Sequence, residues 1–245
     1  MTILLTNDDG VSSEGINTLA NALSKEHKII VVAPNGNRSA SSHSLTIFGD
    51  LIFKKEKISD KYESYSLSGT PADCVKFAMH YFNDIKFDLV LSGINAGDNL
   101  GSNTLYSGTL AAAVEGNYFD IPSIAFSCVS HRNCRFTEDA EMILKLFPSL
   151  LKIASPKVAL NVNFPNIPRE EIKGVRFAPL GRMGYDDYYQ ENENGSYSLK
   201  GEPIYEIEGE SDVDLARKGY ITLTPILFDR TDFNTMKEFP EIELL

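Results

Sequence analysis

The stretch ILLTNDDG at residues 3–10 decides the fold of this 245-residue chain. Its first half, from Ile3 to Thr6, is a short apolar run, and its second half is a cluster of turn-forming residues. That succession is typical of a buried strand that enters a loop. From Glu14 to Lys25 apolar residues recur at helical spacing, and the run KIIVVA at 28–33 is again strand-like. These residues predict a βαβ unit at the start of the chain.

The same alternation continues through the middle of the chain. Thr70 and Pro71 suit the cap and the first position of a helix, and we expect a further helix to begin at Ser107-Gly108-Thr109. Further strands are predicted at residues 87–91, 122–127 and 158–162, with a loop rich in Gly and Asn at 93–106. Alternating strands and helices imply an α/β fold with a doubly wound, mostly parallel sheet.

The character of the sequence changes after about Pro179. Polar and aromatic residues with Gly at intervals predict a hairpin, followed by a short helix and a strand at 220–224. We therefore expect a core at residues 1–180 and a C-terminal extension at 181–245 that closes onto it. Because a lone hairpin has little core of its own, this extension is also predicted to act as an oligomerisation arm.

The bulk composition excludes several classes of protein. A net charge of −11 disfavours non-specific binding to nucleic-acid polymers or to anionic membranes, which require a cationic surface. The three cysteines do not have the spacing of a disulfide framework or of a zinc site. No apolar run is long enough to span a bilayer, and the N-terminal residues do not resemble a signal peptide, so we expect a cytoplasmic location.

Unusual polar residues follow the predicted strands at their carboxyl ends, where open α/β sheets bind ligands. They are Asp8 and Asp9 after the first strand, residues 37–39 after the second, residues 68–70 before a helix, and Asn95 after the strand at 87–91. Adjacent carboxylates repel each other, and a divalent cation relieves that repulsion. Carboxylate, hydroxyl and amide oxygens suit Mg²⁺ or Mn²⁺, whereas zinc prefers His or Cys. For an isolated pair, the alternative is a plain turn in which Asp8 or Asp9 caps the next helix.

A phosphate site is predicted at residues 106–109, Tyr-Ser-Gly-Thr, which precede an Ala-rich helix. The backbone N–H groups and hydroxyls at such a helix start can hold an anion, although an ordinary Ser or Thr cap would have the same sequence. His43 is either an acid or positioning group or a hydrogen-bonded loop histidine. The signatures of P-loop NTPases, zincins, serine hydrolases and classical dinucleotide-binding proteins are absent from the sequence.

Seven ordered motifs resemble those of the SurE family across nearly the whole chain. They are TNDDG at 6–10, PNGNRSASSHSLT at 34–46, SGTPADCV at 68–75, SGINAGDNLG at 92–101, YSGTLAAAVEG at 106–116, NVNFP at 161–165 and GYITLTP at 219–225. The resemblance implies a Rossmann-like core and a 5′/3′-nucleotidase that hydrolyses nucleoside monophosphates and short polyphosphate. It also implies a homodimer or homotetramer.

Carried over by motif, the resemblance implies one divalent ion per subunit. Its ligands would be Asp8, Asp9, Ser39 and Asn95, with Asp8 and Asp9 also catalytic. Phosphate would be held by Ser107, Gly108 and Thr109, while Asn99 and His43 are candidate substrate contacts. Two positions depart from the family pattern, namely Ala40, where the family often has Gly, and Asn103-Thr104, which replaces an acidic and aliphatic pair.

Two rival functions share part of this pattern. A non-catalytic nucleotide-binding regulatory module would have the same fold and anion site without turnover. A glycosyltransferase-like α/β enzyme would hold a nucleotide-sugar through a metal and paired carboxylates. Phosphate release and product analysis distinguish both from a nucleotidase.

Overall fold

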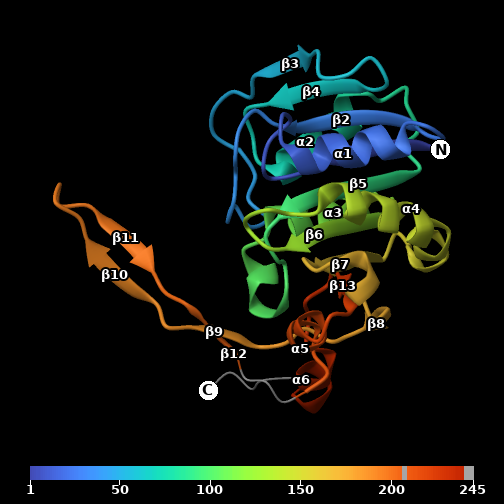
Figure 1. Cartoon of the computed structure of the whole chain (residues 1–245). Coiled ribbons are helices and arrows are strands. Elements are labelled where there is room, and N and C mark those ends of the chain that lie inside the picture. The colour runs from blue at the N-terminus through green and yellow to red at the C-terminus, as the bar shows by residue number, and fades with distance from the viewer. Residues whose placement is uncertain (206–208, 240–245) are drawn as a thin grey trace.

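A nine-stranded sheet organises the computed structural model, which describes residues 1–205 and 209–239 (Figure 1). The strand order is β3-β4-β2-β1-β5-β6-β7-β13-β8. The strands are β1 (Thr2–Thr6), β2 (Lys28–Pro34), β3 (Phe53–Glu56), β4 (Glu63–Leu67), β5 (Leu89–Ala96), β6 (Ser123–Val129), β7 (Val158–Pro165), β8 (Val175–Phe177) and β13 (Ile221–Leu227). From β4 to β7 along this order the neighbouring strands run parallel, whereas β3 and β13 are antiparallel to β4 and β7.

Helices cover both faces of the sheet (Figure 1). On one face lie α1 (Glu14–Leu23) and α4 (Phe136–Ile153), which contact each other, and on the other lie α2 (Pro71–Tyr81) and α3 (Gly108–Tyr118). Side chains alternate across a strand, so Ile3 and Leu5 of β1 pack in the α1–α4 cluster while Leu4 packs with α2. Each fully buried Leu or Ile contributes about 1.5–3 kcal/mol, and this two-sided burial explains the unbroken apolar runs.

The predicted βαβ pattern and the doubly wound sheet are confirmed, with differences at the element ends. β5 continues to Ala96, into the predicted loop, and the 3-10 helix η1 (Gly101–Leu105) follows it. The α2 cap is confirmed, since the Thr70 hydroxyl accepts from the Asp73 N–H in a capping box. The strands β3 and β4 and the helix α4 were not predicted from the sequence.

The C-terminal extension leaves the core and returns to it. The hairpin of β10 (Tyr188–Glu191) and β11 (Tyr197–Lys200) projects from the body, beyond the pair β9 (Met183–Tyr185) and β12 (Pro203–Tyr205) (Figure 1). After the helix α5 (Asp212–Arg217), β13 pairs with β7 inside the main sheet. The remaining short helices are η2 (Arg169–Glu171) and α6 (Phe233–Glu238). Among the described residues no helix has the length and apolarity needed to cross a bilayer.

Candidate active site

The carboxyl ends of three neighbouring parallel strands meet at one edge of the sheet. Because β2, β1 and β5 are adjacent, the turn after β1, the loop after β2 and the end of β5 lie close together beside the start of α3. A cleft of about 220 Å³ lies at this edge. It is lined by Asp8, Ser39, Ala40, Asn95, Ala96, Asp98, Asn99, Asn103, Tyr106, Ser107 and His131. Five of the site residues predicted from the motifs line this cleft, namely Asp8, Ser39, Asn95, Asn99 and Ser107, whereas Asp9, Gly108, Thr109 and His43 are not among its lining residues.

Asp8 is the most deeply buried carboxylate of the cleft, with 4% of its surface exposed. Its Oδ1 accepts a hydrogen bond of 2.6 Å from the hydroxyl of Thr109. The pKa of Asp8 is raised to about 6, chiefly by burial and also by the neighbouring charge of Asp9, while the Thr109 hydrogen bond opposes the shift. The Asp8 carboxylate is therefore held in place while its negative charge is poorly compensated.

Asp9 points toward the end of β5. Its Oδ2 accepts from the backbone N–H of Ala96 at 3.1 Å, and burial raises its pKa although that hydrogen bond opposes the shift. The turn itself is built by Asn7, whose Oδ1 accepts from the Gly10 N–H and whose Nδ2 donates to the Ser13 hydroxyl. The helix α1 has Ser13 as its cap residue, so the alternative in which Asp8 or Asp9 caps that helix is wrong.

Ser39 and Asn95 face the same cleft from two further elements. The Ser39 N–H donates to Asn37 Oδ1 at 2.9 Å, which shapes the turn that carries the Ser39 hydroxyl. Asn95 is 8% exposed, and its Nδ2 donates to the Gly97 carbonyl at 2.9 Å. With the Asn95 amide nitrogen engaged in this way, its carbonyl oxygen is the atom available to a ligand.

The sequence predicted that the hydroxyls at the start of α3 hold phosphate, whereas in the structure both make hydrogen bonds within the protein. Ser107 is the helix cap and accepts from the Leu110 N–H at 2.9 Å, while the Thr109 hydroxyl is committed to Asp8. The ordinary capping role is therefore confirmed for Ser107. The backbone N–H groups at the first positions of α3 are the groups that could still bind an anion, because a helix start leaves its first donors without partners inside the helix.

Gly108 allows the loop after β2 to approach the helix start closely. A Cβ at this position would lie 2.7 Å from Ser41 Oγ and 3.1 Å from Asp8 Cβ. Ser41 Oγ is buried and has no hydrogen-bond partner within the described part of the chain. An unpartnered hydroxyl next to Asp8 and an open helix start is a feature that a polar ligand would satisfy.

The oxygen-rich residues fit a hard divalent cation better than zinc. In residues 1–205 and 209–239 no cluster of three or more His, Cys, Asp or Glu side chains has the geometry of a metal site. An ion held here would therefore rely on the two carboxylates supplemented by hydroxyl and amide oxygens, a donor set that suits Mg²⁺ or Mn²⁺. The raised pKa of Asp8 means that its surroundings disfavour the ionised carboxylate, and a bound cation would stabilise that ionised form.

The two candidate substrate contacts have different surroundings. Asn99 lines the cleft, and its Nδ2 donates to the Ser127 hydroxyl at 2.7 Å. The His43 ring lies 2.8 Å from Glu115 on α3, and His43 is not among the residues that line the cleft. His131, by contrast, lines the cleft but was not selected from the sequence. It follows the end of β6, so the rule that identified Asp8 and Asn95 could also have identified His131.

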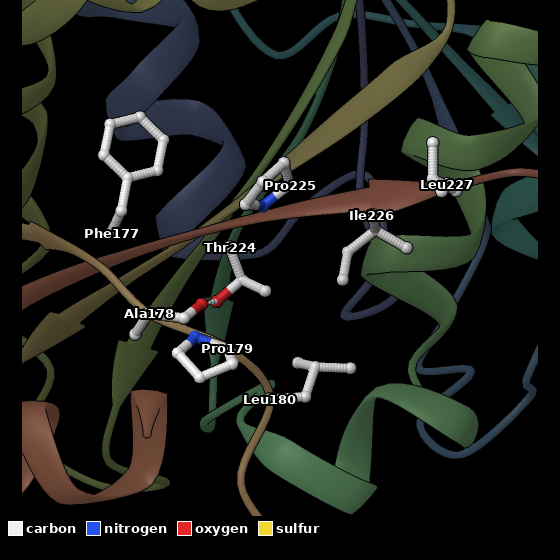
Figure 2. Close-up of a pocket in the computed structure, with 8 residues that line it drawn as sticks. All are labelled: Phe177, Ala178, Pro179, Leu180, Thr224, Pro225, Ile226 and Leu227. Carbon is white, nitrogen blue, oxygen red and sulfur yellow. Dashed lines mark hydrogen bonds between the residues drawn. The ribbon is translucent and has the colours of Figure 1, made fainter. Parts of the chain in front are cut away.

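A larger cavity of about 640 Å³ lies away from these carboxylates (Figure 2). It is lined by Phe177, Ala178, Pro179, Leu180, Thr224, Pro225, Ile226 and Leu227, where the Thr224 hydroxyl donates to the Ala178 carbonyl (Figure 2). Among the residues that the structure describes, no titratable side chain lines this cavity, which therefore has no side-chain acid or base from that part of the chain. The smaller polar cleft is the better candidate for the chemistry.

The fold and the cleft define a Rossmann-like α/β protein with a polar cleft, lined by Asp8 and Asp98, at the carboxyl edge of its sheet. The family model described as survival protein SurE matches residues 3–187, and the chain belongs to the SurE family. It is 42% identical to the 5′-nucleotidase SurE of Clostridium botulinum (strain ATCC 19397 / Type A) over 100% of both chains. It is 40% identical to that of Petrotoga mobilis over 97% of both. The crystal structure of a SurE protein from Aquifex aeolicus superposes with a TM-score of 0.84 at 38% identity, covering 97% of this chain and 98% of that one.

Proposed function

We propose that this chain is a divalent-metal-dependent phosphomonoesterase that converts nucleoside 5′-monophosphates into nucleoside and phosphate. The 5′-nucleotidase activity follows from family membership, because relatives with that name align with this chain over its full length at 40–42% identity. The metal dependence is the finer part of the proposal. It is supported chiefly by the buried Asp8, whose pKa of about 6 reflects burial and the adjacent charge of Asp9.

Four side chains would hold the ion: Asp8, Asp9, Ser39 and Asn95. When bound, such an ion polarises a phosphate oxygen and orients an attacking water. The protein supplies the remaining electrostatic groups. The N–H groups that begin α3 would stabilise developing negative charge on the phosphate, and the Thr109 hydroxyl keeps the Asp8 carboxylate in one orientation.

Proton transfer is a second task for the carboxylates. A carboxylate whose pKa is raised by burial, as for Asp8 and Asp9, is a better base near neutral pH than an exposed one. Direct attack by water and attack by Asp8 to form an aspartyl-phosphate are both compatible with this arrangement. Rapid quenching during turnover separates them, because direct attack leaves no phosphate attached to Asp8.

The wider functional proposal follows the family resemblance. It comprises activity on nucleoside 3′-monophosphates and short polyphosphate, one ion per subunit, a cytoplasmic location, and a homodimer or homotetramer. The exposed side chains of Tyr188, Tyr189, Tyr197 and Leu199 on the projecting hairpin support contact with another subunit, because an isolated hairpin buries little apolar surface.

Phosphate release from a panel of nucleoside monophosphates tests the proposal. Purified protein is assayed with Mn²⁺ or Mg²⁺ and after treatment with a chelator. We expect release that disappears on chelation and returns when the metal is restored. Binding of a nucleotide without release, under every metal condition, would instead support the non-catalytic nucleotide-binding module. Transfer of a sugar to an acceptor would support the glycosyltransferase-like alternative.

A further inference from the structure

The loop between β2 and β3, residues 35–52, carries Ser39 and is here called the Ser39 loop. Two of its residues with side chains adopt left-handed backbone conformations, Ala40 at φ 57° and Ser42 at φ 52°. This conformation costs free energy for any residue with a Cβ. Such a loop holds its shape only when contacts with the rest of the protein fix it.

Several contacts attach the Ser39 loop to neighbouring elements. The Ser42 N–H donates to the Tyr106 carbonyl at 2.9 Å, and the Ser42 hydroxyl donates to the Leu105 carbonyl at 2.8 Å. Further along, the backbone N–H and hydroxyl of Thr46 both donate to the Asp73 carboxylate at the start of α2. Between these two attachments lies His43.

His43 makes the loop's contact with a buried charge. Its Nε2 lies 2.8 Å from Glu115 Oε2, and Glu115 on α3 is only 4% exposed. Lys76 of α2 approaches the other carboxylate oxygen at 2.7 Å, and its ammonium lies 4.7 Å from the centre of the Tyr118 ring. Burial would raise the pKa of Glu115, but the hydrogen bonds from His43 and Lys76 outweigh it and lower that pKa.

A gain in stability does not explain why Glu115 is buried in contact with His43 and Lys76. Burying a carboxylate removes its hydration, and the attraction of its partners does little more than restore that loss. Its location is informative, because Glu115 belongs to α3, and the cap residue of that helix, Ser107, lines the cleft. A rigid helix therefore connects the anchor of the Ser39 loop with the proposed phosphate site.

We propose that the His43–Glu115 contact is a positioning device that holds Ser39 at a fixed place relative to Asp8 and the start of α3. His43 is then a positioning residue that acts through the loop and makes no contact with the reacting atoms. This inference rests on the proposed function, since it assumes that Ser39 is a metal ligand. Its structural part, the restraint of the loop by His43, can be measured without metal.

The test compares His43→Ala with His43→Gln and Glu115→Gln. Hydrogen–deuterium exchange of the metal-free full chain is expected to be faster at residues 37–46 in His43→Ala than in wild type. Isothermal titration should show Mn²⁺ binding weakened by about tenfold in His43→Ala, as for the loss of other groups that orient metal ligands. His43→Gln can still donate to Glu115 and should stay near wild type. Glu115→Gln keeps an acceptor and should fall between these two.

His80→Ala is the matched control, because His80 is an exposed histidine on α2 that lies outside the Ser39 loop. It should leave both exchange at 37–46 and Mn²⁺ binding unchanged. A His43→Ala protein that exchanges these residues as slowly as wild type, or binds Mn²⁺ equally well, would overturn the positioning role. Absence of Mn²⁺ binding by wild type would overturn the proposed metal site instead, so the two failures are distinguishable.

Discussion

The hydroxyl of Thr109 donates a 2.6 Å hydrogen bond to Asp8 Oδ1 and thereby joins the start of α3 to the turn after β1. These residues are 101 positions apart in the chain, yet both are buried and in direct contact. The bond orients a proposed metal ligand and connects it with the helix that would hold the phosphate. It also stabilises the ionised form of Asp8 against the effect of burial.

Replacing Thr109 with Val tests this connection, because Val keeps the shape and removes the hydroxyl. A hydrogen bond to a charged group contributes about 1.5–3 kcal/mol, so we expect kcat/KM to fall by roughly tenfold or more. Steady-state phosphate release measures this effect. Thr224→Val is the control, since it removes another buried hydroxyl, bonded to the Ala178 carbonyl, away from the cleft. Equal losses in both variants would contradict a specific role for Thr109.

Gly108→Ala tests the close approach of the Ser39 loop to the helix start. The added Cβ would lie 2.7 Å from Ser41 Oγ and 3.1 Å from Asp8 Cβ, so we expect activity to fall by roughly tenfold or more. Stability should change little, because Ala favours a helix over Gly by about 1 kcal/mol and offsets part of the strain. Phosphate release and thermal unfolding are measured together.

The double variant Gly108→Ala with Ser41→Ala removes the closest obstructing atom and should recover part of the lost activity. Gly36→Ala is the matched control, since a Cβ there would meet nothing within 4 Å. If Gly108→Ala retained full activity, the packing at the start of α3 would not matter for the reaction.

Asp9→Asn tests the paired carboxylates. The substitution preserves shape and removes one negative charge, so we expect kcat to fall by at least about a hundredfold, the scale of losing a principal electrostatic group. The same change should weaken Mn²⁺ binding and should remove the charge that helps to raise the pKa of Asp8. Asp88→Asn, which alters a carboxylate at the opposite end of β1, is the control. Full activity of Asp9→Asn in excess Mn²⁺ would contradict its proposed role.

Asp139 on α4 gives a prediction about pH and stability. Burial raises the pKa of Asp139 to about 7, against 3.8 for the ordinary group, so the folded state binds the proton more tightly than the unfolded chain. The stability associated with this proton is complete below about pH 4 and is lost as pH rises toward 7, by up to roughly 1.4 kcal/mol per pH unit. Asp139→Asn should therefore flatten this part of the stability profile.

Urea unfolding at several pH values between 4 and 8 measures the effect. Glu141→Gln, an exposed change on the same helix, should leave the slope unchanged. An Asp139→Asn protein with the wild-type slope would show that another group is responsible.

The core of the fold could be predicted from the sequence because its strands are buried on both faces. The apolar run before Asp8 and the Thr70-Pro71 pair carry local signals, and both led to correct elements. Asp8, Ser39 and Asn95 were found by the simple rule that ligands bind at the carboxyl ends of parallel strands.

The elements and contacts that were not predicted have only weak sequence patterns or join residues far apart in the chain. The helix α4 begins at Phe136, its cap residue Arg135 makes no side-chain capping hydrogen bond, and it contains Pro148, a residue that usually ends a helix. The strand β3 is partly exposed, so it lacks a continuous apolar run. The contact of His43 with Glu115 joins residues 72 positions apart, and no local pattern predicts such a pair.

Anomalous diffraction from crystals soaked in Mn²⁺ tests the metal site most directly. We predict one peak in each subunit, within coordination distance of carboxylate oxygens from both Asp8 and Asp9 and next to Ser39 and Asn95. Fully soaked crystals without a peak beside those two carboxylates would contradict the central claim, whatever activity the protein displays.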